Sequence, residues 1–157
     1  MLLLAYILVT LGTFFFMEFV AWFTHKYIMH GFLWYLHKDH HQKKPGFFEK
    51  NDAFFLIFAI PSSLCFIFGA IDGYDFKTYI GIGIALYGAT YFLVHDIIIH
   101  QRFNLLKHVS NTYLKAIRKA HHIHHTVETK HYASCFGMLL VPVKYHQEAK
   151  QMTGKNK

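Results

Sequence analysis

The sequence predicts an all-α integral membrane protein, a bundle of three to four apolar helices with a histidine-rich helical cap at the cytoplasmic face. The 157-residue chain is 54% hydrophobic and 18% aromatic, which is too apolar for an ordinary soluble domain. Its apolar residues form segments long enough to cross a bilayer. Ten of its 14 histidines recur in one repeated pattern at or beyond the ends of these segments. We expect residues 1–157 to form a single domain.

Three segments approach the roughly 20 residues that cross a hydrocarbon core of about 30 Å. They are Leu2–Phe23, apolar except for Glu18, then Ala53–Ile71, and finally Tyr79–Val94 with its continuation to Ile99. We interpret the first as a retained anchor, because no basic residue precedes it and no small-residue cleavage site follows it. A fourth apolar stretch, Tyr132–Val143, is too short to span. We expect it to be re-entrant, interfacial or packed against the helices.

Small residues distinguish the third span. Gly81, Gly83, Ala85 and Gly88 would let another helix approach closely. The first two glycines lack the third glycine of a dinucleotide-binding fingerprint, so they do not indicate a nucleotide site.

Basic residues set the expected orientation. With three spans, segments 25–51 and 101–157 share one side and contain five and ten lysines and arginines, whereas loop 72–78 contains only Lys77. The basic side is expected to be cytoplasmic. The net charge of +7 follows this topology and suits anionic lipid headgroups. We therefore expect contact with the lipid bilayer and no binding of nucleic acid.

The histidines form two copies of one composite pattern. The first copy is His25-x4-His30 followed by His37-x2-His40-His41, and the second is His95-x4-His100 followed by His121-x2-His124-His125. Imidazole nitrogen suits iron, zinc, copper and nickel. Two matched sets of five imidazoles on one side of the membrane therefore predict a site for two metal ions.

Helix geometry distinguishes the triplets from the pairs. At about 100° per residue, each triplet occupies an arc of about 100° and forms one patch that can face a metal directly. The members of a pair, five residues apart, lie about 140° apart on a regular helix. We expect the two members of a pair to reach different metals, unless the helix loosens as it leaves the membrane.

Several residues near these motifs could support the ligands. Glu18, Asp39 and Asp96 could each accept a hydrogen bond from a ligand imidazole and fix its tautomer. Glu18, an intramembrane carboxyl group, could equally pair with another span. Asn51 and Asp52 begin the second span, where we interpret them as helix N-caps.

Four histidines stand outside the repeat. His122 would flank the last triplet in a supporting or surface position, and His131 could be a neighbour of the site. His108 and His146 lie among lysines and polar residues, where solvated surface positions are expected.

The motifs together resemble a known family. They comprise His25 to Gly31, Leu36 to His41, Gly46 to Asp52, His95 to Arg102, Ala120 to His125, Phe136-Gly137 and Pro142. This set is similar to that of the bacterial β-carotene 3-hydroxylases, small members of the fatty acid hydroxylase superfamily of membrane non-haem di-iron proteins. The resemblance covers about residues 15 to 143. One departure is His122, because the family usually has a basic residue other than histidine there, and this leaves open which of His121 and His122 points inward.

The resemblance implies a di-iron monooxygenase of carotenoid biosynthesis. Such an enzyme uses O2 and two electrons to hydroxylate C3 of β-ionone rings, converting β-carotene through β-cryptoxanthin to zeaxanthin. The implied iron ligands are His25, His30, His37, His40, His41, His95, His100, His121, His124 and His125. The resemblance also implies a bacterial inner membrane location. The chain contains no flavin, nicotinamide or iron–sulfur motif, so an external donor such as ferredoxin with its reductase is expected.

Three alternatives remain open, one within the same superfamily and two from other classes. A related membrane di-iron hydroxylase or desaturase could act on a fatty acid or a sterol. A histidine-rich metal transporter would instead be expected to place its ligands near mid-membrane along a path. A haem cytochrome with two histidine ligands would need single facing histidines within the spans, not triplets outside them.

Overall fold

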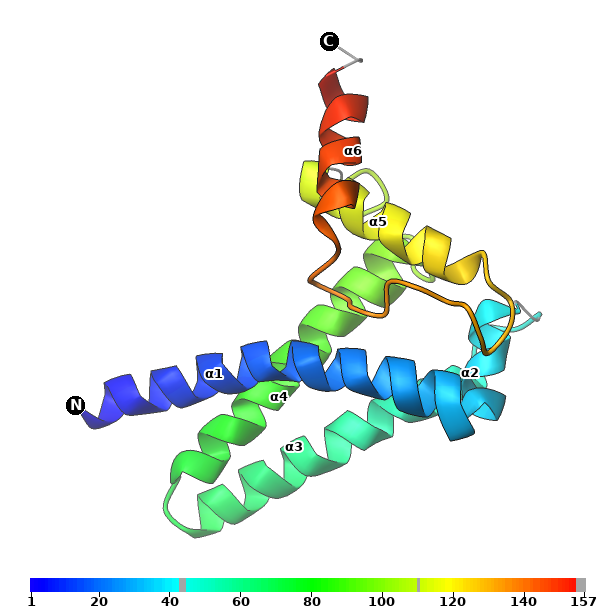
Figure 1. The fold of residues 1–157 in the computed structure, drawn as a ribbon. Helices are drawn as coiled ribbons and strands as arrows, with labels where there is room; N and C mark the ends of the chain where they lie inside the picture. The colour runs from blue at the N-terminus through cyan, green and yellow to red at the C-terminus, as the bar shows by residue number, and fades with distance from the viewer. Residues whose placement is uncertain (43–44, 110, 155–157) are drawn as a thin grey trace.

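The computed structural model describes residues 1–42, 45–109 and 111–154, and none of these residues lies in a β-strand. The elements are α1 (Leu2–Phe23), η1 (Thr24–Phe32), α2 (Trp34–His41), η2 (Lys50–Ala53), α3 (Phe54–Ile71), α4 (Phe76–Phe92), η3 (Leu93–Ile99), α5 (Thr112–His125) and α6 (Val143–Gly154) (Figure 1). The predicted all-α class is confirmed. Four lysines of the charge count, Lys43, Lys44, Lys155 and Lys157, lie outside the described residues.

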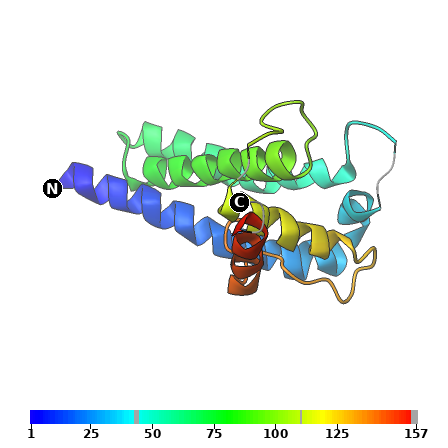
Figure 2. The ribbon, with the colours of Figure 1, turned by 90° about the horizontal axis from the view of Figure 1, so that it is seen from above.

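Among the described residues, three helical stretches are long and apolar enough to cross a membrane, namely Leu2–Phe32, Lys50–Ile71 and Phe76–Ile99. They contain the three predicted spans. Large apolar side chains cover their outer surfaces, with Leu3, Phe16 and Ile67 each more than half exposed. In Figures 1 and 2 the N-terminus and the turn between α3 and α4 lie at one end of the bundle, whereas α2 and α5 lie toward the other.

Glycines bring α4 close to both of the other long helices. A Cβ atom added at Gly81 would lie 2.8 Å from the backbone oxygen of Ser62 in α3, and one added at Gly83 would lie 2.7 Å from the backbone oxygen of Thr10 in α1. At Gly88, nothing lies within 4 Å of an added Cβ. The predicted close packing is thus confirmed at two positions, and Gly88 takes no part in it.

The fourth apolar stretch does not span. Residues 127–142, between α5 and α6, form no helix and pack along α1 and α4, with Met138 buried and Leu139 against the core around Met17 and Tyr87. Of the predicted alternatives, packing against the helices is therefore the one observed. We call residues 127–142 the connecting segment.

Gly83→Ala should destabilise the bundle, because the new methyl group would overlap α1. Overpacking of this kind costs about 1–3 kcal/mol. The measurement is thermal unfolding of the detergent-solubilised protein followed by circular dichroism. Gly88→Ala is the matched control and should be neutral or slightly stabilising, since alanine is favoured over glycine in a helix by roughly 0.5–1 kcal/mol. Equal melting temperatures for the two variants would contradict the close contact at Gly83.

Candidate metal centre

Both His-x4-His pairs lie on π-helical turns. His25 and His30 belong to η1, while His95 belongs to η3 and His100 caps it, with its backbone N–H donating to the His95 carbonyl at 2.9 Å. A π-helix closes its hydrogen bonds over five residues, so residues five apart lie one above the other. The ring centroids are accordingly 5.3 Å apart in the first pair and 4.5 Å apart in the second. The loosened helix is the alternative that holds, and the expectation that each pair divides between metals is wrong.

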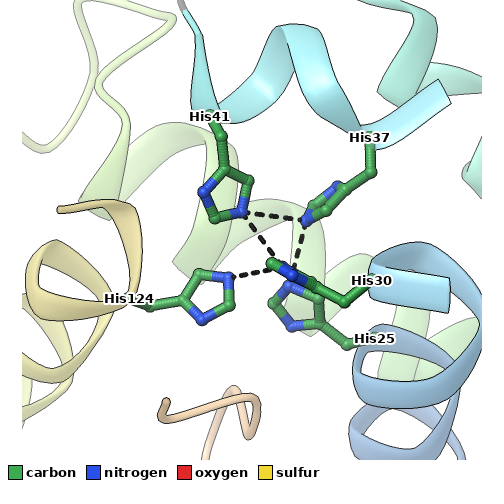
Figure 3. Close-up of side chains that lie close together, drawn as sticks. All are labelled: His25, His30, His37, His41 and His124. Atoms are coloured by element: carbon green, nitrogen blue, oxygen red, sulfur yellow. Dashed lines mark hydrogen bonds between the residues drawn. The ribbon is translucent and has the colours of Figure 1, made fainter. Parts of the chain in front are cut away.

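The described histidines with the ligand pattern gather in two groups. The first group is His25, His30, His37, His41 and His124, and the second is His40, His95, His100 and His121. Within each group, one ring nitrogen of every member lies within 4.8 Å of the corresponding atoms of the others. Figure 3 shows the five rings of the first group turned toward a common centre from η1, α2 and α5.

The triplets, unlike the pairs, divide between the groups. His37 and His41 point into the first group, whereas His40 points into the second. The expectation that each triplet faces one metal is therefore wrong. On an α-helix, positions i and i+4 share a face, but i+3 lies about 60° to the other side of i. Because α2 lies between the two groups, it serves both of them, and α5 does the same through His121 and His124.

His125 lies beside the second group. Its ring centroid is 4.5 Å from that of His121, 4.7 Å from that of His40 and 4.9 Å from that of His100, and the ring also stacks on His41 of the first group at 4.4 Å. Its Nε2 atom is buried and has no hydrogen-bond partner in the part of the chain that the structure describes. With His125 included, each group contains four histidines of one sequence repeat and the middle triplet histidine of the other repeat. The two groups are thus interlocked.

Oxygen acceptors fix the orientation of seven of these rings. The Nδ1 atoms lie near oxygens as follows: His25 to Phe136 O at 3.0 Å, His30 to Lys130 O at 3.2 Å, His37 to Asn51 Oδ1 at 2.6 Å, His40 to Glu49 Oε2 at 2.7 Å, His41 to Val127 O at 2.9 Å, His95 to Asp96 Oδ2 at 3.2 Å and His124 to Ser134 O at 2.7 Å. Carbonyl and carboxylate oxygens only accept, so Nδ1 carries the proton in each neutral ring. The Nε2 lone pair is left for the centre of the group.

The inner nitrogens face one another without protons between them. The Nε2 atoms of His25 and His37 are 3.1 Å apart, those of His37 and His41 are 3.2 Å apart, and those of His40 and His95 are 3.1 Å apart. The dashed lines of Figure 3 mark such contacts in the first group. Because these rings already donate through Nδ1, their lone pairs repel. A cation at each centre would turn this repulsion into coordination, so the donor set fits a metal ion.

Comparison with known proteins places the chain in a family. The profile of the fatty acid hydroxylase family matches residues 10–141. The chain belongs to the fatty acid hydroxylase family. With three helices able to span a membrane and two histidine groups suited to a metal, this hydroxylase is an integral membrane enzyme.

The hydroxylase is also similar to curated relatives. It is 40% identical to the β-carotene hydroxylase of Pantoea ananas over 126 residues, which cover 80% of this chain and 71% of the relative. It is 34% identical to the β-carotene hydroxylase of Paracoccus sp. (strain PC1) over 136 residues, which cover 86% and 83%. The chloroplastic β-carotene hydroxylase 2 of Capsicum annuum is 36% identical over 115 residues, 70% of this chain and 37% of that protein. No solved structure gives a significant match.

Burial lowers the pKa of several ligand-pattern histidines that lie beyond the apolar spans of the hydroxylase. For those beyond the apolar spans, removal from water lowers the pKa of His41 from 6.5 to about 4, that of His124 to about 3 and that of His37 to about 2. Burial and the neighbouring imidazoles hold the pKa values of His40 and His121 well below the usual range. Neutral imidazole is the form that binds a metal.

The carboxylates around the hydroxylase site differ from the sequence expectation. Asp96 accepts from His95, as predicted. Asp39 contacts no described histidine and instead accepts from the backbone N–H of Lys50 at 2.7 Å. Glu49 holds His40, and sequence reasoning missed it because it lies in a loop where no periodicity points to a partner. The expectation that Asp39 supports a ligand is therefore wrong, because Asp39 instead holds the backbone at Lys50.

Asn51 and Asp52 have separate roles. Asn51 accepts from His37, so its interpretation as a helix cap is wrong. Asp52 accepts from the backbone N–H of Glu49 at 3.1 Å and does act at the start of η2. The two residues are adjacent in sequence, and only the position of α2 decides which of them meets a histidine.

Glu18 acts on the connecting segment rather than on an imidazole. One carboxyl oxygen accepts from the backbone N–H groups of Met138, Leu139 and Leu140 at 3.0, 2.9 and 2.9 Å, and the other accepts from the Tyr87 hydroxyl at 2.8 Å. Of its two predicted roles, pairing with another span is the one observed. The connecting segment supplies the carbonyls that orient four histidines of the first group, so Glu18 supports these rings indirectly.

The remaining histidines lie at or near the surface. His121 is buried in the second group, whereas His122 is exposed, which shows which of the two points inward. His108 and His131 are exposed as well. His146 is half-buried and stacks on Tyr113, with ring centroids 5.9 Å apart.

Glu18→Ala should release the connecting segment, because three N–H groups lose their acceptor. Each unsatisfied buried donor costs about 1–3 kcal/mol. We expect faster hydrogen exchange at residues 138–140, measured by mass spectrometry on the detergent-solubilised protein. The control Tyr87→Phe removes a single hydrogen bond to the same carboxyl group and should leave exchange at these amides slow. Unchanged exchange in Glu18→Ala would show that other contacts hold the segment.

The metal-free protein should lose stability as the pH falls. Below about 6.5 an unfolded chain protonates its histidines, but His41, His124 and His37 resist protonation in the folded state down to about pH 4, 3 and 2. Stability should therefore decline as the pH falls below about 6.5 toward pH 5, with a slope that approaches about 1.4 kcal/mol per pH unit for each such histidine. Melting temperatures across this range, with His41→Gln expected to lessen the slope, provide the test. A flat profile would contradict neutral packing of the rings.

Proposed function

We propose that this hydroxylase is a di-iron, O2-dependent β-carotene 3-hydroxylase that converts β-carotene through β-cryptoxanthin to zeaxanthin. The observation that carries the proposal is the interlocked pair of histidine groups, in a chain 40% identical to the β-carotene hydroxylase of Pantoea ananas. The proposed ligands are His25, His30, His37, His40, His41, His95, His100, His121, His124 and His125. The proposal treats residues 1–157 as one membrane-embedded domain.

The chemistry decides between metals. Hydroxylation of an unactivated ring carbon requires a redox metal, and zinc has no redox chemistry. When bound, two iron ions would supply the activation of O2 that this reaction needs. The electrons come from an external donor such as ferredoxin with its reductase.

The protein's own residues hold and orient the centre. Nε2 atoms bind, and Nδ1 atoms donate to fixed acceptors, so each imidazole keeps one tautomer and one orientation. The rings need no reorganisation before metal binding, because they already converge. Most are buried, which limits the access of water to the site.

A hollow of about 930 Å³ opens onto the second group. Its lining includes His40, His100, His125, Gln42 and Arg118. These side chains are polar, so the hollow suits water better than a polyene. The carotenoid therefore approaches from the lipid side, along the apolar helices.

The position of the site along the spans fits a bilayer substrate. His25 and His30 lie near the end of the first span, and His95 lies near the end of the third. An apolar carotenoid lying in the membrane would present its ring there, and the product hydroxyl would stay near the headgroups. From the positive-inside rule, we propose that this end faces the cytoplasm and that the enzyme lies in the bacterial inner membrane.

The alternative within the family is a hydroxylase or desaturase that acts on a fatty acid or a sterol. The match to the fatty acid hydroxylase family supports this alternative only in general terms. A metal transporter is disfavoured, because the ligands gather at the end of the spans and not along a path through them.

The purified protein should contain about two iron ions per chain and show no haem absorption. Iron is quantified by inductively coupled plasma mass spectrometry after expression in iron-supplemented cells. His40→Ala and His124→Ala should each lower the iron content, because each removes a ligand from a different group. Zinc as the bound metal together with zinc transport in vesicles would refute the oxygenase.

His121→Ala should abolish hydroxylation, and the adjacent His122→Ala should retain it. His121 is buried in the second group, whereas the His122 side chain is exposed. The assay expresses each variant in cells that make β-carotene and separates the pigments by chromatography. Unchanged β-carotene with the unmodified protein, iron and a competent electron donor would reject the carotenoid proposal. Hydroxylation of a fatty acid or sterol would favour the alternative.

A further inference from the structure

The two histidine groups differ in the charge of the atoms behind them. In the first group, every observed Nδ1 partner is a neutral oxygen, four of them backbone carbonyls and one the amide oxygen of Asn51. In the second group, His40 donates to Glu49 and His95 donates to Asp96. Carboxylates therefore support only the second group among the described contacts.

These two carboxylates support histidines that face the same metal position. The Nδ1 distances are 2.7 Å from His40 to Glu49 and 3.2 Å from His95 to Asp96. The Nε2 atoms of the same two rings are 3.1 Å apart, so both supported nitrogens face one metal position. The carboxylate side chains are only 20% and 13% exposed, which limits screening by water.

Arg102 keeps both carboxylates in place. Its Nη1 atom donates to Asp96 at 2.8 Å, leaving the other oxygen of Asp96 for His95. The same guanidinium binds both oxygens of Asp52, at 2.7 and 2.9 Å, and Asp52 holds the backbone N–H of Glu49. One arginine thus joins the supports of two histidines that come from different elements.

A carboxylate behind an imidazole makes it a stronger ligand. It draws the Nδ1 proton, raises the basicity of Nε2 and adds negative charge near the cation. Loss of such a partner typically weakens metal binding by about 10–100-fold. A neutral carbonyl fixes the same tautomer but adds no net charge.

We infer that the two metal positions are inequivalent, and that the position of His40 and His95 binds a divalent metal ion more tightly and fills first. Arg102 is a positioning residue for this tight position. The inference rests on the proposed two-metal function and deepens it by giving the order of loading. It concerns the metal-binding step and not the choice of substrate.

The test titrates the metal-free protein in detergent with Co²⁺ and follows visible absorption and calorimetric heat. The unmodified chain should bind in two steps of different affinity. Glu49→Gln and Asp96→Asn keep an oxygen acceptor but remove the charge, so each should weaken the tighter step by about 10–100-fold and leave the weaker step unchanged. Arg102→Gln should weaken the same step.

The matched control adds a negative charge to the first group. Asn51→Asp places a carboxylate behind His37, so it should tighten the weaker step and narrow the gap. His25→Ala should remove the weaker step, and His95→Ala should remove the tighter one, which assigns each step to its group. Far-ultraviolet circular dichroism of every metal-free variant identifies those that are misfolded.

Several outcomes would overturn the inference. Equal affinities in the unmodified chain, equal weakening of both steps by Glu49→Gln, or no effect of Asn51→Asp would each do so. Two-step binding without hydroxylation of β-carotene would reject the proposed substrate and leave the inference standing. Hydroxylation of β-carotene by a protein that binds two metal ions with equal affinity would support the proposed substrate and overturn the inference.

Discussion

Lone pairs that face one another in a buried space are the constraint on which this structure depends. At 3.1 to 3.2 Å, the Nε2 atoms of neighbouring rings are in contact, and the acceptors on Nδ1 leave no proton to join them. Such an arrangement is unfavourable for free imidazoles and favourable around a cation. Each surrounding element helps to hold the imidazole rings in this arrangement against the repulsion between their lone pairs.

The helices meet this constraint by local changes of geometry. Two π-helical turns, at Thr24–Phe32 and Leu93–Ile99, bring histidines five residues apart onto one face. The α-helical triplets do the opposite and serve both groups, because α2 and α5 each lie between them. This exchange of the middle histidine ties the two sequence repeats together, so neither repeat completes a group alone.

The connecting segment also holds the rings in this arrangement, through its backbone carbonyls. Its carbonyls at Val127, Lys130, Ser134 and Phe136 orient four rings of the first group. A non-helical backbone beside apolar helices needs internal partners, and Glu18 provides one oxygen for three of its N–H groups. The second group relies instead on side-chain carboxylates and Arg102. The two halves of the centre are therefore built by different means, despite their similar sequences.

Much of this was determined by the sequence alone. The length and apolarity of the spans, the repeat of ten histidines and the burial of small residues at Gly81 and Gly83 follow from local composition and period, which do not depend on distant contacts. The partners of Glu18, Glu49 and Asn51 do depend on them, because these residues meet groups that are 9 to 122 positions away. The assignment of each histidine to a group also required the tertiary structure. Two histidines five residues apart lie about 140° apart on an α-helix but on one face of a π-helix. Only the tertiary structure decided which of the two helices forms.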